Sequence, residues 1–159
     1  MKKFWSVLVT ILLLLFLGVG CSILVGRYKF NQMVANVEKQ VEEYHDANYK
    51  YIELADIEVY KKDGNLQIVE SIEANNIIVD LCKNMNNYTT IISKTLFKET
   101  WDNYKYSIQW MCTDFERHID LDRTFVYSVK VVDPEDYTKV YLWIDEYGVI
   151  REDITSLSK

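Results

Sequence analysis

The fold is decided by residues 51–69, YIELADIEVYKKDGNLQIV, in which two apolar-rich runs are separated by a short polar stretch. Apolar and polar residues alternate in the first run, as they do in a strand with one buried face. Asp63-Gly64, between the runs, is a favoured pair for a two-residue type I′ turn, because both positions of that turn need a positive φ. The stretch therefore predicts a β-hairpin.

A helix is expected directly after this hairpin. Ser71 is a suitable N-cap, because a serine hydroxyl can accept a hydrogen bond from a free backbone N–H at the start of a helix. Apolar residues then recur with helical spacing until the asparagine-rich stretch at 84–87. The apolar face of this predicted helix consists of Ala74, Ile77, Ile78, Leu81 and Met85.

The C-terminal third is interpreted as a series of antiparallel strands. A turn at residues 101–103 precedes them, and Asp133-Pro134-Glu135-Asp136 is a second turn. The predicted strands cover residues 104–112, 114–122, 124–132 and 137–144, and a closing hairpin turns at 146–148. We therefore predict an α+β domain in which one helix packs on an antiparallel sheet that ends in a β-meander.

The closing hairpin carries one resemblance to a known family. Residues 141–145, YLWID, stand before Gly148 and Val149. This segment resembles the terminal hairpins of small bacterial envelope modules such as PepSY domains. It is short and follows generic hairpin chemistry, and no family is assigned from it.

The first 26 residues are typical of a segment that inserts into a membrane. Lys2 and Lys3 are followed by an uncharged and mostly apolar run over residues 4–26, and Arg27 restores charge. A helix of this length reaches about 34 Å, which is enough to cross a hydrocarbon core of roughly 30 Å. The segment is expected to be either a transmembrane anchor or a signal peptide.

The two alternatives differ in what happens at Cys21. Residues 17–21, LGVGC, resemble a bacterial lipoprotein signal, in which small residues precede a cysteine that is lipidated and becomes the new N-terminus. The apolar residues 23–25 favour an uncleaved anchor instead, because cleaved signals have a shorter apolar region. In both cases we expect a protein of the bacterial cell envelope, held at the cell membrane by a single-pass helix or by a lipid.

The rest of the chain is acidic. Because Lys2 and Lys3 are the only charged residues before residue 22, the remainder carries 16 basic and 24 acidic side chains, a net charge of −8. This excludes nucleic acid as a partner, because duplex binding needs clustered lysine and arginine. It also opposes attraction to anionic cytoplasmic lipids, and we therefore expect an extracytoplasmic domain.

An amphipathic stalk helix is predicted between the membrane segment and the domain. Its apolar stripe is expected to pack on the domain, although pairing with a second copy or contact with the bilayer would also satisfy it, so the oligomeric state stays open. We divide the chain into residues 1–26, 27–48 and 49–159. The stripe consists of Phe30, Met33, Val34, Val37, Val41 and Tyr44.

One row of residues suggests a metal site. On a strand, every second side chain points to the same face, and an acidic face with one imidazole could hold a divalent cation. Neighbours on that face are nearly 7 Å apart, so a solvated outer face or a charged strand edge is the competing interpretation. The row consists of Asp114, Glu116, His118, Asp120 and Asp122.

Two cysteines remain beyond the membrane segment. Cys82 lies on the predicted helix and Cys112 on a predicted strand, so they could form a disulfide in an oxidising compartment. Alternatively, both are small buried apolar residues.

Enzyme templates are missing. The sequence contains no Gly-x-Ser-x-Gly, His-Glu-x-x-His, Cys-x-x-Cys or glycine-rich phosphate loop. We therefore expect no enzymatic activity and no cofactor, with a small metal-dependent enzyme using the acids of residues 114–122 as the alternative.

Aromatic residues favour a binding or interaction module. Flat aromatic rings bury a large area at low entropy cost, which suits contact with an envelope protein or a glycan, although strands are also rich in aromatic residues. The aromatic residues on or beside the predicted meander are Trp101, Tyr104, Tyr106, Trp110, Tyr127, Tyr137, Tyr141 and Trp143.

Overall fold

The computed structural model describes the backbone of residues 2–121 and 123–155, and side chains within these ranges from residue 19 onward. The chain forms two compact units, Met1–Val37 and Glu38–Lys159. The second unit contains the last turns of the first helix together with all the strands and the remaining helices, and it is described here by itself.

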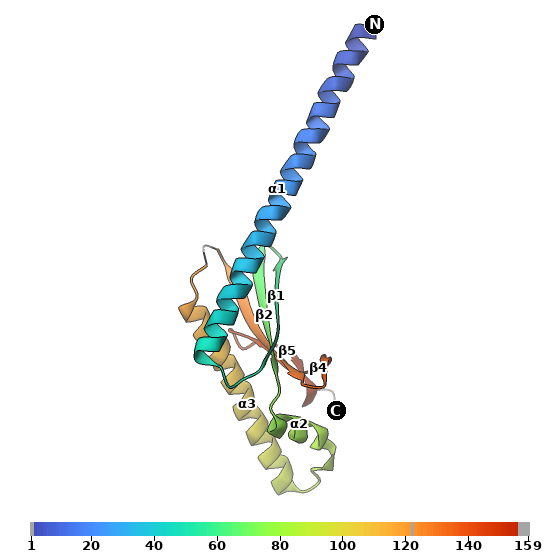
Figure 1. The fold of residues 1–159 in the computed structure, drawn as a ribbon. Helices are drawn as coiled ribbons and strands as arrows, with labels where there is room; N and C mark the ends of the chain where they lie inside the picture. Colours follow the sequence, from blue (N-terminus) through green and yellow to red (C-terminus); the bar gives the residue numbers. More distant parts are fainter. Residues whose placement is uncertain (1, 122, 156–159) are drawn as a thin grey trace. The chain divides into compact units, whose positions relative to one another are not determined.

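Helix α1 (Lys2–Asn48) is unbroken, so both the predicted membrane segment and the predicted stalk are helical (Figure 1). Most of the predicted membrane segment, residues 4–26, lies outside the part of the chain whose side chains are described. Within the described part, no helix combines the length and the apolar character that are needed to cross a bilayer.

The predicted hairpin is confirmed. Strands β1 (Leu54–Lys62) and β2 (Asn65–Glu73) pair antiparallel, and Lys62 lies opposite Asn65. The two turn residues have positive φ angles, 52° at Asp63 and 88° at Gly64, as a type I′ turn requires.

The helix after the hairpin begins later than predicted. Ser71 is not its N-cap, because β2 continues to Glu73, with Ser71 paired to both flanking strands. The N-cap of α2 (Asn76–Lys83) is Asn75, whose side chain accepts a hydrogen bond of 3.0 Å from the Ile78 amide. A short 3₁₀ helix, η1 (Met85–Asn87), follows.

Helix α3 (Ile91–His118) replaces two predicted strands and a predicted turn. The predictions for residues 101–103, 104–112 and 114–122 were therefore wrong. Tyrosine, tryptophan and isoleucine favour strands locally, but a buried stripe at helical spacing overrides that preference. The stripe consists of Trp101, Ile108, Met111, Cys112 and Phe115.

The five strands form one mixed sheet in the order β1-β2-β3-β4-β5. The C-terminal meander is confirmed by the antiparallel pairs β3–β4 and β4–β5. The sheet is not wholly antiparallel, because β2 pairs parallel with β3 after the crossover through α2, η1 and α3. The three C-terminal strands are β3 (Phe125–Asp133), β4 (Asp136–Asp145) and β5 (Ile150–Asp153).

The core lies between α3 and one face of the sheet (Figure 1). The Phe115 ring of α3 stacks on the Tyr127 ring of β3, with centroids 3.8 Å apart. Strands β2 and β3 are buried along most of their length, so the parallel pair is the centre of the domain.

Candidate functional site

The acids that suggested a metal site do not form a one-sided row. Asp114, Glu116 and His118 lie on α3, where successive side chains turn by about 100°, so Glu116 points away from the side that Asp114 and His118 share. Asp120 follows the helix, and Asp122 lies outside the described residues. In the part of the chain that is described, no group of three or more potential ligands is placed to hold a metal ion.

Asp114 is bound by tyrosine hydroxyls and a histidine. Its Oδ2 accepts hydrogen bonds of 2.7 Å from the hydroxyls of Tyr44 and Tyr49, and its Oδ1 lies 3.4 Å from His118 Nδ1. The hydrogen bond from Tyr49 lowers the pKa of Asp114, and burial raises the pKa of Tyr44 to about 12. The carboxylate therefore joins the end of α1 to α3 as an ionised acceptor.

The cysteines of the domain are both buried free thiols, so the structure contains no bond between Cys82 and Cys112. Burial raises the pKa of Cys82 to about 12, and Cys112 Sγ lies 3.5 Å from the Ile144 carbonyl oxygen. This burial agrees with the alternative that they act as small apolar residues. Cys21 is exposed on α1, and its lipidation remains a prediction.

A buried polar cluster joins the last turns of α1 to the sheet. His45 Nδ1 contacts one carboxylate oxygen of Glu70, and the Tyr127 hydroxyl donates to the other. The second ring nitrogen of His45 lies 2.8 Å from the carbonyl oxygen of Ile52, to which it donates. His45 is 2% exposed and Glu70 is 1% exposed, so the cluster belongs to the core.

The contact between the histidine and the glutamate of this cluster couples their protonation. Burial raises the pKa of Glu70. Burial is the largest single influence on His45 and lowers its pKa, but the hydrogen bonds to Glu70 and to the Ile52 carbonyl, together with the negative charge nearby, outweigh it, and the net pKa of His45 is raised. A charge shared between buried partners costs less than a carboxylate without a partner, so the pair can stay in the core.

This cluster was not predicted from the sequence, although Glu70 gives a signal for it. Glu70 has the same parity as Ile68 and Ile72 in β2, so it points into the core with them. An acid at an inward-facing position requires a buried partner.

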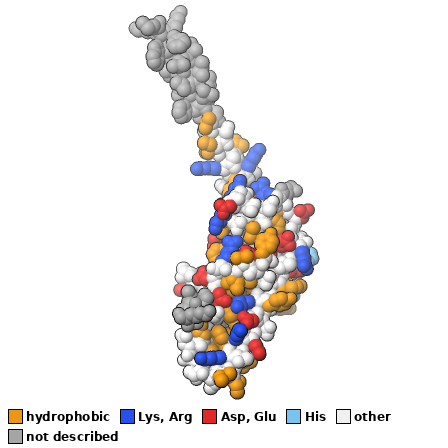
Figure 2. All heavy atoms as spheres, turned by 180° about the vertical axis from the view of Figure 1, so that it is seen from behind, with side chains coloured by type: hydrophobic (Ala, Val, Ile, Leu, Met, Phe, Trp, Pro, Cys, Tyr) orange, Lys and Arg blue, Asp and Glu red, His pale blue; other side chains and the backbone are white. Residues whose placement is uncertain are grey.

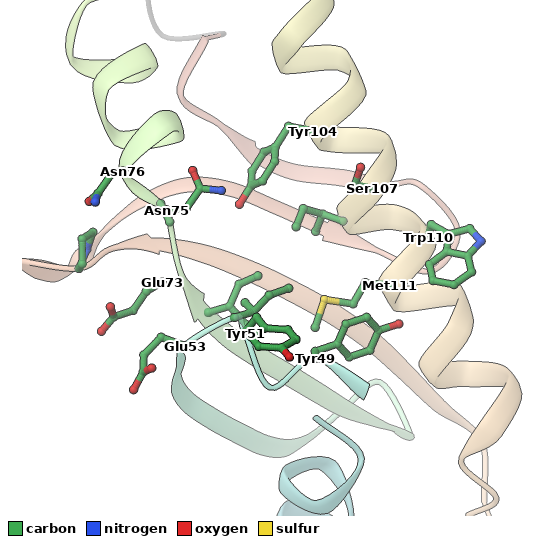
Figure 3. Close-up of a pocket in the computed structure, with 15 residues that line it drawn as sticks. Tyr49, Tyr51, Glu53, Glu73, Asn75, Asn76, Tyr104, Ser107, Trp110 and Met111 are labelled. Carbon is green, nitrogen blue, oxygen red and sulfur yellow. The ribbon is translucent and has the colours of Figure 1, made fainter. Parts of the chain in front are cut away.

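A candidate ligand site is a cavity of about 550 Å³ beside α3 (Figure 3). Its apolar wall combines sheet and α3 side chains, and its aromatic wall combines the α1–β1 connection with α3. The apolar side chains include Ile52, Ile72, Ala74, Ile108 and Met111. The aromatic side chains are Tyr49, Tyr51, Tyr104 and Trp110.

The polar part of the cavity is acidic or neutral. Glu53 and Glu73 lie side by side at its edge (Figure 3). Their backbones are joined by a hydrogen bond of 2.9 Å from the Glu73 amide to the Glu53 carbonyl oxygen. Asn75 and Asn76 continue this edge at the start of α2. Among the described residues that line the cavity, none is basic. The arrangement can accept an apolar group that carries a positive charge beside it.

Only two of the eight aromatic residues singled out in the sequence, Tyr104 and Trp110, line this cavity. Tyr127 and Tyr141 belong to the core, and Trp101 is buried with its Nε1 donating to Asp153 Oδ1 at 3.1 Å. The other three take different positions: Tyr106 is exposed, Tyr137 donates to Glu73, and Trp143 lies under Lys130 and Arg151.

No protein-family model, no curated protein and no solved structure matches this chain. The functional interpretation therefore rests on the residues of the domain. Of the features described, the cavity is the one that combines volume, apolar surface and a few polar side chains, which ligand sites typically share.

Proposed function

We propose that this protein is a membrane-tethered protein of the bacterial cell envelope whose extracytoplasmic domain is a binding module. The tether is the apolar N-terminal segment, either as a single-pass helix or, after lipidation at Cys21, as a lipid anchor. The ligand site is the cavity beside α3, and the single observation that carries the proposal is its aromatic, apolar wall next to two acids.

The proposed ligand is a segment of a partner protein that presents an apolar side chain next to a lysine or arginine. The volume of about 550 Å³ lies within the range of ordinary ligand pockets and exceeds the space of a packing defect. Tyr51 is 91% exposed and Trp110 is 54% exposed, so aromatic surface is available to a ligand. Aromatic faces attract cations, and Glu53 and Glu73 add charge complementarity.

The methyl group of Met111 gives a direct test. The chain has four methionines, of which Met111 lines the cavity, while Met33 lies on α1 and Met85 in η1. The full chain would be labelled with ¹³C-methyl methionine and reconstituted in nanodiscs. The probes are the blocked dipeptides acetyl-Phe-Lys-amide and acetyl-Phe-Glu-amide.

We expect the lysine-containing probe to shift the Met111 methyl resonance, with no shift at Met33 or Met85. The double variant Glu53→Gln/Glu73→Gln should weaken binding by about tenfold, because each exposed ion pair contributes a fraction of a kcal/mol to about 1 kcal/mol. Ser107→Phe, at a lining position, should abolish the shift. Asn103→Phe, one turn earlier on an exposed part of α3, is the matched control and should bind normally.

Two results would refute the proposal. One is an unchanged Met111 resonance at millimolar concentrations of both probes. The other is an equal response to the lysine and glutamate probes that survives Ser107→Phe, since this would indicate binding outside the cavity.

A further inference from the structure

The first turns of α3 expose large aliphatic side chains. Ile91 is 85% exposed, Ile92 is 81% exposed and Leu96 is 64% exposed. Ile92 and Leu96 are four residues apart, so they lie on one side of the helix. Residues 91–98 are named the α3 tip below. Figure 2 shows exposed hydrophobic side chains at the end of the domain where α2 and the start of α3 lie.

The α3 tip is a formed helix rather than a frayed end. Thr90 and Ser93 make a reciprocal capping box, with the Ser93 amide donating to Thr90 Oγ1 at 3.1 Å. On the inner side of the helix, Phe97 packs against Tyr88, with ring centroids 5.4 Å apart. The helix is therefore capped and partly packed through Phe97, while Ile91, Ile92 and Leu96 stay exposed.

The charge around the tip is opposite to the charge of the domain. Residues 81–98 contain Lys83, Lys94 and Lys98 and no aspartate or glutamate, whereas the chain beyond residue 21 carries a net charge of −8. Lys83 ends α2, and the other two lysines are on the first two turns of α3. Lys83, Lys94 and Lys98 are all exposed, and the segment is bordered by one acid at each end, Asp80 and Glu99.

We propose that the α3 tip binds an anionic lipid surface. Ile91, Ile92 and Leu96 enter the interface between headgroups and acyl chains, and the three lysines contact the phosphate groups. Aliphatic side chains flanked by lysines form the surface that interfacial helices present to a bilayer. Each lysine near an anionic membrane increases the partition constant about fivefold. A neutral groove on a protein partner would not attract the lysines in this way. The proposal uses the proposed membrane tether only for proximity and is independent of the cavity.

An environment-sensitive fluorophore at position 92 tests the contact. The full chain with Cys21→Ser and Ile92→Cys would be labelled with a nitrobenzoxadiazole group, since Cys82 and Cys112 are buried. A second protein with Tyr106→Cys carries the same label at an exposed position on α3 outside the tip. Both would be reconstituted in liposomes of phosphatidylcholine alone and in liposomes with added phosphatidylglycerol.

We expect the label at position 92 to become severalfold brighter and to emit at shorter wavelength in the anionic liposomes only. The label at position 106 should respond to neither lipid. Replacing the three lysines with glutamine should reduce the response, as should high salt, because the attraction is screened within a Debye length. Ser107→Phe should leave the response unchanged, so failure of the cavity proposal and failure of this proposal are distinguishable.

Three outcomes would overturn the proposal. The first is the same emission at positions 92 and 106 in both lipids. The second is a response in anionic liposomes that persists in the triple lysine variant. The third is a response at position 92 that requires added membrane proteins, which would assign the tip to a protein partner instead of a lipid surface.

Discussion

Two glutamates are buried in the same domain with opposite surroundings. Glu70, in the middle of β2, is bonded by His45 and Tyr127. Glu146, after β4, is 8% exposed, and neither of its carboxylate oxygens has a hydrogen-bond partner among the described residues. Burial raises the pKa of both acids, to about 7 for Glu146. Burial therefore raises the pKa of both acids, whereas the hydrogen-bond partners determine whether the buried acid stabilises or destabilises the fold.

The difference also has a spatial meaning. Glu70 receives its partners from α1 and β3, so its carboxylate joins three elements that are distant in sequence. Burial is the main cause of the raised pKa of Glu146, and its acidic neighbours Asp145 and Glu116 raise the pKa further. The first glutamate therefore stabilises the fold, and the second reduces stability when it is ionised.

The largest expected effect is that of removing Glu70. Glu70→Ala should lower the free energy of unfolding by about 3–5 kcal/mol, because it leaves His45 and Tyr127 buried without their acceptor. The measurement is denaturant unfolding of the full chain in detergent, followed by circular dichroism. Glu70→Gln keeps the size of the side chain and should cost less. A loss below about 1 kcal/mol for Glu70→Ala would contradict the anchoring role.

Removing the charge of Glu146 should have the opposite sign. Glu146→Gln should raise the free energy of unfolding by roughly 1–3 kcal/mol at pH 8 and have little effect at pH 4.5. The native acid keeps its proton up to a pH of about 7, whereas an unfolded glutamate loses it near pH 4.5. Stability is therefore lost as the pH rises through this window. An equal effect at both pH values would show that ionisation is not the cause.

With Glu146→Gln in place, the slope that begins above the unfolded histidine pKa of about 6.5 should belong to the His45–Glu70 pair. The folded pKa of His45 is raised, so its contribution to stability is complete below the unfolded pKa of about 6.5 and is lost as the pH rises through the folded value. The expected slope is at most about 1.4 kcal/mol per pH unit for one proton. Unfolding of Glu146→Gln at pH 6, 7 and 8, below the range in which unfolded cysteines lose their protons, measures it, and adding His45→Gln/Glu70→Gln should flatten the slope there. A variant that keeps the wild-type slope would assign the proton to another group.

The smallest effect is expected at the tyrosines that bind Asp114. Tyr44→Phe and Tyr49→Phe should each cost about 0.5–1.5 kcal/mol, because each removes one hydrogen bond while Asp114 keeps the other. The two changes together should cost more than the sum of the single changes, since the carboxylate then loses both donors. Strict additivity in a double-mutant cycle would indicate that the two bonds are independent.

Local signals account for the parts of the fold that were predicted correctly. The Asp63-Gly64 turn and the Pro134 turn fix two hairpins within a few residues, and the structure has both. The end of β2 was misjudged because Ser71 is a plausible cap only if the strand stops there. Its pairing with two neighbouring strands is a nonlocal property.

Helix α3 shows where local preference failed. Tyr104, Tyr106 and Trp110 favour a strand by residue type, yet the chain here is helical because Trp101 and Phe115 fill the core against the sheet. Because of the same error, the cavity could not be predicted. Tyr104 and Trp110 were recognised as candidates for contact, but they meet Tyr49 only when α3 is a helix and the α1–β1 connection lies beside it.

The parallel pairing of β2 with β3 has a consequence for the order in which the chain is made. Tyr127, whose hydroxyl donates to Glu70, follows it by 57 positions. The ribosome therefore completes the first hairpin, α2 and α3 before Tyr127 is made. Until then, β2 has a neighbour on one side only and its inward acid remains in water. Consolidation of the domain must await the last quarter of synthesis, and a nascent chain that stops before residue 125 has no native core to protect it from proteases.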